Sequence, residues 1–150
     1  MNEVDAYKIF RRKVIFKYDR CDRIENIVGV GNPDVNYCID GVEGWIELKC
    51  PKEPKRETTP LFGSNHKLSI DQMNWFLRQK NSLGVGFVLI VTDKSHWILI
   101  DGCKYGDSIN LLTKQQLIEI SHIAFKENYE RGFGDMRKIL KLAIGNNNGI

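Results

Sequence analysis

Apolar residues recur at two different spacings along the chain, and the two spacings predict two kinds of element. A helical period, with an apolar residue every three or four positions, is found in four segments: 3–18, 69–82, 113–125 and 135–144. Ser69 and Thr113 stand at helix starts, where their hydroxyls can cap the first turn. The pattern therefore predicts four helices distributed along the chain.

Extended patterns between these segments predict strands over 22–30, 34–39, 44–48, 85–92 and 95–101. Residues 85–91 are apolar on both faces apart from one position held by Gly, which favours a central, fully buried strand. Asp40-Gly41 joins two of the strands and is a strong hairpin signal. A helix, three strands, a helix, two strands and further helices together favour an α/β fold, a mixed β-sheet flanked by helices.

Other segments are expected to lie outside this framework. Residues 50–67 are rich in Pro, Lys, Glu and Thr and predict an exposed loop. The tail, 145–150, is rich in Asn and Gly and is expected to fray. Trp45 and Trp75 are expected to fill the core, because one lies on a predicted strand and the other on a predicted helix.

Length and composition narrow the class of protein. The 150 residues suit a single domain, 1–150, with a core over about 1–125 and a C-terminal helix and tail over 126–150. With 22 Lys+Arg and 19 Asp+Glu, the net charge of +3 excludes a polybasic nucleic-acid coat but not a local basic surface. No apolar stretch approaches the roughly 20 residues of a membrane span, and no signal-peptide pattern is visible. We therefore expect no membrane association and an intracellular, cytoplasmic location.

The four cysteines, Cys21, Cys38, Cys50 and Cys103, are far apart and form no Cys-x-x-Cys pair. In a reducing compartment they are expected to be free, mostly buried thiols rather than a disulfide framework or a zinc site.

Two carboxylates and a lysine are expected to meet at the open end of the predicted hairpin. Asp34 begins one strand and Lys49 ends its neighbour, so antiparallel pairing brings Asp34 close to 47–49. Glu47 and Lys49 are two residues apart and emerge from the same face. Neighbouring carboxylates repel unless a cation neutralises them, and oxygen ligands suit Mg²⁺ or Mn²⁺. A lysine beside such an ion can orient an attacking water or stabilise a phosphoryl oxygen.

This pattern resembles the signature of the PD-(D/E)XK nuclease superfamily. Pro33-Asp34, twelve intervening residues and Glu47-Leu48-Lys49 match it, and a helix opening Leu-Ser-x-x-Gln follows, as in small phage-type VRR-NUC and Holliday junction resolvase-like endonucleases. The resemblance covers about 23–101 and implies a restriction-endonuclease-like core. It also implies that Asp34, Glu47 and the Leu48 carbonyl bind Mg²⁺ (or Mn²⁺), and that Lys49 serves the attacking water.

The resemblance implies two accessory residues, and the sequence leaves alternatives open for both. Gln72 occupies the position of the family's helix glutamine, but Ser69 and Gln72 also fit a capping box. For an upstream acid, Glu25 and Glu3 compete, and Glu25 is preferred because a strand and a turn could return it to the same edge.

The expected activity is Mg²⁺-dependent hydrolysis of DNA phosphodiester bonds. Cations near the site are candidate phosphate contacts: Lys52, Lys55, Arg56 and Lys67. The resemblance favours a structure-selective endonuclease for Holliday junctions or other branched DNA, acting as a homodimer in a bacterial or phage-infected host. The alternative is a catalytically inactive protein of the same fold that binds nucleic acid or inhibits a partner.

Overall fold

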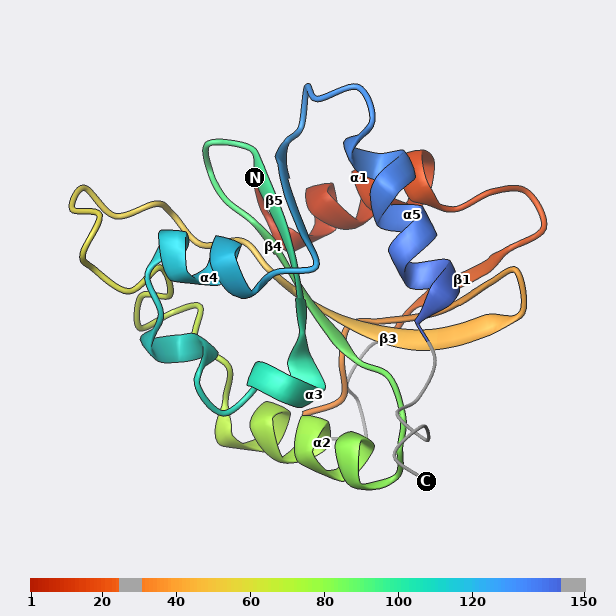
Figure 1. Ribbon diagram of the computed structural model, residues 1–150, viewed down its shortest axis with the longest axis horizontal. Helices are drawn as coiled ribbons and strands as arrows, with labels where there is room; N and C mark the ends of the chain where they lie inside the picture. The colour runs from red at the N-terminus through yellow and green to blue at the C-terminus, as the bar shows by residue number, and fades with distance from the viewer. Residues whose placement is uncertain (25–30, 144–150) are drawn as a thin grey trace.

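A mixed sheet runs through the middle of the protein (Figure 1). Within residues 1–24 and 31–143, which this computed structural model describes, the sheet has six strands that are neighbours in chain order. They are β1 (Arg20–Arg23), β2 (Val35–Ile39), β3 (Val42–Lys49), β4 (Phe87–Val91), β5 (His96–Asp101) and β6 (Ile123–Lys126). β3 and β4 are parallel, and the other neighbouring pairs are antiparallel.

Helices cover both faces of this sheet (Figure 1). One face carries α1 (Glu3–Val14) and α5 (Gly132–Leu142), which pack against each other. The other face carries α2 (Ile70–Asn81), α3 (Gly102–Tyr105), a short 3-10 turn, η1 (Ile109–Leu111), and α4 (Lys114–Ile120). The predicted fold class, a mixed sheet flanked by helices, is confirmed.

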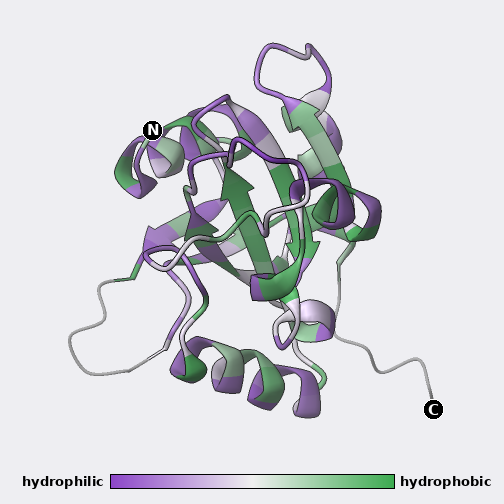
Figure 2. Cartoon of the chain, turned by 90° about the vertical axis from the view of Figure 1, so that its left-hand side faces the viewer, coloured by the Kyte–Doolittle hydropathy of each residue, from purple (hydrophilic) through white to green (hydrophobic). Residues whose placement is uncertain are grey.

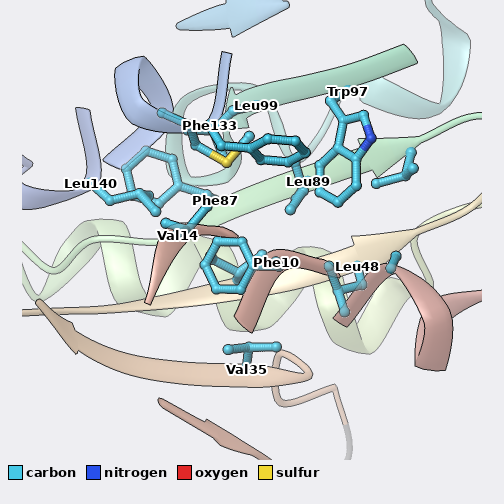
Figure 3. Packing of buried hydrophobic residues seen from close by; sticks show 14 of the residues in the cluster. Phe10, Val14, Val35, Leu48, Phe87, Leu89, Trp97, Leu99, Phe133 and Leu140 are labelled. Carbon is cyan, nitrogen blue, oxygen red and sulfur yellow. The ribbon is translucent and has the colours of Figure 1, made fainter. Parts of the chain in front are cut away.

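The central strand β4 separates two hydrophobic cores. Its residues are all buried and alternate between the faces: Leu89 belongs to the core under α1 and α5, whereas Val88 and Ile90 belong to the core under α2 and α4. Figure 3 shows Leu89 among Phe10, Leu48 and other side chains of the first core. Figure 2 shows hydrophobic colouring on the central strands and hydrophilic colouring on the loops around them.

Local sequence signals account for the turns that position the candidate site. The hairpin between β2 and β3 turns at Asp40 and Gly41, both with positive φ, 50° and 81°, as an Asp-Gly turn requires. Ser69 caps α2 through a hydrogen bond of 3.1 Å from the Gln72 N–H to its hydroxyl. Because β3 and β4 are parallel, the chain must cross over between them, and α2 forms that crossover.

The segment 113–125 is not one helix, and that prediction was wrong. Helix α4 ends at Ile120, and β6 then pairs antiparallel with β5. Strand β5 would otherwise leave an unpaired edge, and pairing lets Phe125 stack on Trp97 at a ring-centroid distance of 6.4 Å. Tertiary pairing therefore overrides the helical spacing of this apolar run.

Other boundaries differ from the predicted ones. The first helix ends at Val14, because Ile15 already has an extended backbone, and the last begins at Gly132 rather than 135. Strand β1 begins at Arg20 and ends at Arg23, and most of the predicted strand 22–30 lies outside the described residues. The core extends past residue 125, since α5 contributes buried side chains to it.

The loop 50–67 is not wholly exposed. Leu61 and Phe62 are buried in the core under α2 and α4, so these apolar loop residues pack as core residues do.

The two tryptophans predicted to fill the core, Trp45 and Trp75, are half-buried and meet edge-to-face at a ring-centroid distance of 5.6 Å. Each tryptophan therefore packs against the other and stays partly exposed.

Cys21, Cys38, Cys50 and Cys103 are free thiols, as expected. Among the described residues, no helix has both the length and the apolar character needed to cross a membrane.

Candidate active site

Asp34 lies immediately before β2, at the open end of the hairpin. Its Oδ2 atom accepts a hydrogen bond of 2.9 Å from the backbone N–H of Leu48 on β3. Val35 pairs with Ile46 in the antiparallel register, so Asp34 is held beside residues 47–49. The hairpin therefore brings the Asp34 carboxylate to the C-terminal end of β3.

Glu47 and Lys49 project from the face of β3 opposite to Ile46 and Leu48, which enter the core under α1. Both polar residues are buried, with 2% and 7% of their surface exposed. Lys49 Nζ lies 3.8 Å from Glu47 Oε2. Burying a carboxylate and an ammonium is costly, so this pair on a core strand indicates a functional role.

The charge of Glu47 is only partly compensated by the protein. Burial raises the pKa of Glu47 well above its usual range, and the Asp34 carboxylate raises it further, whereas Lys49 lowers it. The Oε1 atom of Glu47 is buried and has no hydrogen-bond partner among the described residues. A buried, unpartnered carboxylate oxygen beside a second carboxylate is a donor arrangement that a hard divalent cation can neutralise.

These donors fit an ion that keeps several water ligands. Within residues 1–24 and 31–143, no group of three or more His, Cys, Asp or Glu side chains is arranged to hold a metal. Mg²⁺ commonly takes one or two protein carboxylates and completes its shell with water and substrate phosphate oxygens. Asp34 and Glu47 match the number of carboxylates that such a shell takes from a protein.

Lys49 also donates hydrogen bonds to the segment that leads into α2. Its Nζ atom donates to Gln72 Oε1 at 3.2 Å and to the backbone carbonyl of Lys67 at 3.3 Å. Gln72 Oε1 also accepts from the Ser69 N–H at 2.9 Å, which completes the capping box. Gln72 therefore caps the helix and contacts Lys49 at the same time.

A third carboxylate, Glu3, comes from the first turn of α1. Burial raises the pKa of Glu3, and the nearby Asp34 carboxylate raises it further, whereas Lys49 lowers it. Glu25, the preferred upstream acid, lies outside the described residues. The competing residue Glu3 thus interacts electrostatically with Asp34 and Lys49.

The four cations predicted to contact DNA are all exposed: Lys52, Lys55, Arg56 and Lys67. Lys67 is tied to the site through its backbone carbonyl, which accepts the hydrogen bond from Lys49. Lys55 and Arg56 line a cavity of about 340 Å³ between the loop after β3 and the start of α4. Lys67 therefore adjoins the site, whereas Lys55 and Arg56 line a cavity that Asp34, Glu47 and Lys49 do not line.

Glu53 organises the loop after β3, a role that the sequence did not reveal. Its side chain is 6% exposed and accepts a hydrogen bond of 2.6 Å from Thr92 Oγ1. It also pairs with His96 Nδ1 at 2.6 Å and Lys114 Nζ at 2.8 Å. Burial alone would raise the pKa of Glu53, but these donors outweigh burial and lower it to about 2. The partners follow 39 to 61 residues later, so no local pattern indicated them.

Comparison with known proteins shows a likeness in fold. No protein-family model matches the chain, and no curated protein matches its sequence. The chain matches the solved structure of Hjc, a Holliday junction resolvase from the archaeal hyperthermophile Archaeoglobus fulgidus, with a TM-score of 0.52 and 13% identity. The match covers 83% of this chain and 91% of that chain. The fold is therefore similar to that of a Holliday junction resolvase, which confirms the expected restriction-endonuclease-like core.

Proposed function

We propose that this protein is a divalent-metal-dependent DNA endonuclease that hydrolyses phosphodiester bonds and prefers branched DNA such as a four-way junction. The observation that carries the proposal is the buried Glu47 carboxylate, which has an unpartnered oxygen, beside Asp34 and 3.8 Å from Lys49. The resolvase-like fold supports the choice of substrate. Residues in the positions of a nuclease motif on a nuclease fold are a more specific signal than either feature alone.

Each residue of the site has a distinct task in this proposal. Asp34, Glu47 and the Leu48 carbonyl hold Mg²⁺ or Mn²⁺, which when bound lowers the pKa of a water and neutralises charge on the phosphate. The Lys49 ammonium has three N–H donors, and Gln72 and the Lys67 carbonyl occupy two of them. The third remains for orienting the attacking water or a phosphate oxygen.

Exposed cations around the site supply the affinity for DNA. In this proposal Lys52, Lys55, Arg56 and Lys67 neutralise backbone phosphates and release counterions, which makes binding dependent on salt concentration. The protein acts as a homodimer, because a four-way junction is resolved by two symmetric cuts and a two-fold dimer supplies two equivalent sites. Light scattering of the purified protein, alone and with a junction, measures the assembly directly.

Cleavage assays test the proposal. Wild type, Asp34→Asn and Lys49→Ala are incubated with four-way, duplex and single-stranded DNA in Mg²⁺, Mn²⁺ or EDTA. Asn is chosen at position 34 because its side-chain oxygen can still accept the Leu48 N–H. We expect wild type to cut the junction in either metal and not in EDTA, and both variants to lose more than about a hundredfold in rate.

A separate readout follows metal binding without DNA. Mg²⁺ should raise the melting temperature of wild type, because a ligand that binds only the folded state stabilises it, and should not raise that of Asp34→Asn. If wild type cuts no substrate in either metal, or Asp34→Asn cuts as fast as wild type, the endonuclease proposal is wrong. Junction binding without cleavage would instead favour an inactive nucleic-acid-binding protein of this fold.

A further inference from the structure

Two cavities adjoin at the turn between β4 and β5, and Lys94 lines both of them. One, of about 470 Å³, lies between the end of α1, this turn and the end of β6, and its cations are Arg12, Lys13, Lys94 and Lys126. The other is the cavity of about 340 Å³ after β3, where Lys94 joins Lys55 and Arg56, and where the carboxylates Glu57 and Glu53, the latter paired with Lys114, also line the wall. We call the basic surface formed by Arg12, Lys13, Lys55, Arg56, Lys94 and Lys126 the Lys94 trough.

The larger cavity carries more positive than negative charge. Within the described residues, none of its four cations forms an ion pair. The neighbouring Arg11, by contrast, donates a hydrogen bond of 2.7 Å to the Cys21 carbonyl, so its side chain already has a partner in the protein. The lining carboxylate, Glu127, accepts a hydrogen bond of 2.9 Å from Trp97 Nε1. Four cations gathered around one carboxylate attract an anionic ligand.

The turn that carries Lys94 is fixed by its backbone. Ser95 has a φ of 62°, and its N–H donates to the Thr92 carbonyl at 2.9 Å. The Ser95 carbonyl accepts the Glu127 N–H at 2.9 Å, which fastens the end of β6 to the turn. The floor of the larger cavity is therefore preformed, and its lysine and arginine side chains extend from fixed backbone positions.

The loop after β3 places the trough beside the candidate active site. The Asp93 N–H donates to the Pro51 carbonyl at 3.2 Å, and Asp93 Oδ1 accepts the Glu53 N–H at 2.7 Å. Glu53 is four residues after Lys49, and an extended chain spans at most about 3.6 Å per residue. The turn therefore contacts the chain no more than about 14 Å from Lys49.

Helix α1 gives a second, independent connection. Its first turn carries Glu3, which interacts with Asp34 and Lys49, and its last turn carries Arg12 and Lys13. Arg12 follows Glu3 by nine positions, which corresponds to about 13.5 Å along the helix axis. Phosphates follow one another about every 3.4 Å of duplex axis on one strand, so this length spans about four base pairs.

We infer that the Lys94 trough binds the phosphodiester backbone of the substrate DNA about four base pairs from the phosphate that is cut. The identity of this ligand rests on the proposed function. Exposed Lys and Arg side chains on a fixed floor neutralise phosphates and read no bases, so the trough recognises the path of the backbone and not its sequence. It extends the candidate DNA contacts from Lys55 and Arg56 to α1 and β6.

DNA-binding measurements with two independent variants test this inference. Lys94→Gln removes the residue that the two cavities share, and Arg12→Gln combined with Lys13→Gln removes two cations from α1. Lys104→Gln is the matched control, since Lys104 is exposed and lines neither cavity. Affinity for a four-way DNA junction is measured by fluorescence anisotropy in EDTA at several salt concentrations, and melting curves verify folding. A junction of the same design in RNA forms a second arm.

We expect Lys94→Gln and the double variant each to weaken junction binding about tenfold. The slope of log affinity against log salt concentration should fall by roughly one for each phosphate that the variant no longer neutralises. Lys104→Gln should bind as wild type does. Binding by both trough variants within twofold of wild type, with an unchanged salt slope, overturns the inference. An equal loss of affinity on the RNA junction overturns the assignment of the trough to DNA.

This test and the cleavage test fail separately. If wild type cuts DNA but the trough variants bind it normally, the trough inference is wrong and the endonuclease proposal stands. If wild type cuts nothing but the trough variants lose affinity for DNA and not for RNA, the endonuclease proposal is wrong and the trough remains a DNA-binding surface.

Discussion

Gln72 and Lys49 are joined by a hydrogen bond of 3.2 Å from Nζ to Oε1, and the same oxygen closes the capping box of α2 by accepting the Ser69 N–H. The sequence left two interpretations of Gln72 open, a helix cap or a residue of the site. The geometry unites them, because the first turn of α2 lies against the end of β3. The helix start thus fixes the direction of the lysine ammonium.

This relationship predicts that Gln72→Ala affects cleavage more than stability. Without the amide oxygen, Lys49 loses one of the acceptors that orient it, and we expect the cleavage rate to fall about 10- to 100-fold. The lost cap should lower the free energy of unfolding by only about 0.5–1 kcal/mol. Single-turnover cleavage and urea denaturation measure the two effects.

The chain offers a matched control in a second capping box. Gln116 Oε1 accepts the Thr113 N–H at 2.9 Å at the start of α4, and among the described residues it accepts no hydrogen bond from a lysine. Gln116→Ala should therefore cost similar stability and leave cleavage unchanged. Equal losses of cleavage in the two variants would reduce Gln72 to a helix cap.

A second prediction concerns the pH dependence of stability in EDTA. The pKa of folded Glu47 is raised above its usual value of 4.5, first by burial and then by Asp34. Its contribution to stability is thus fully present below pH 4.5 and is lost as the pH rises through the folded pKa, because only the unfolded chain releases the proton freely. The free energy of unfolding should therefore fall between about pH 5 and 9 more steeply in wild type than in Glu47→Gln.

Urea denaturation of both proteins at several pH values measures this difference. Mg²⁺ should stabilise wild type most at the alkaline end, where the ionised carboxylate is available to the ion. Parallel pH profiles for wild type and Glu47→Gln in EDTA would show that the buried carboxylate does not titrate in this range.

Features encoded by neighbouring residues were predictable from the sequence. The Asp40-Gly41 turn, the Ser69 cap and the alternation of β3 are each specified within a few residues, and together they fix the hairpin that joins Asp34 to Glu47. The all-apolar strand β4 was equally clear, because only a central strand buries both faces. The hairpin and the central strand determined the sheet and the centre of the site.

Features encoded by distant residues were not predictable in the same way. Strand β6 has helical spacing in isolation and pairs only because β5 presents an edge. In the sequence, Glu53 cannot be told from the other charged residues of the loop. In the structure, it bonds to Thr92, His96 and Lys114. Periodicity places residues on a face of their own element, but it does not say which other element that face meets.

Glu53 yields a third prediction, with the opposite sign of pH dependence. Burial alone would raise the pKa of Glu53, but its hydrogen bonds, that from Lys114 foremost, lower it to about 2. Its contribution is thus present above the unfolded pKa of 4.5 and is lost as the pH falls through about 2. Glu53→Gln should lower the free energy of unfolding by about 1–3 kcal/mol at pH 7, and this difference should shrink below about pH 4.5.

Glu57 provides the control for this experiment, because it is an exposed carboxylate on the same loop. Glu57→Gln should leave the free energy of unfolding within about 0.5 kcal/mol of the wild-type value at every pH. A Glu53→Gln variant as stable as wild type at pH 7 would show that the three donors do not anchor the loop.

The last prediction decides between the two candidate upstream acids. Glu3 is half-buried at the start of α1, where burial and then the Asp34 carboxylate raise its pKa. An ion bound by Asp34 and Glu47 would therefore gain a further negative charge nearby when Glu3 ionises. Glu3→Gln should therefore raise the Mg²⁺ concentration needed for half-maximal cleavage about tenfold. The control is Asp5→Asn, an exposed acid on the same turn, and Glu25→Gln tests the competing residue. A shift of the Mg²⁺ midpoint in Glu25→Gln but not in Glu3→Gln would assign the role to Glu25, as the sequence predicted.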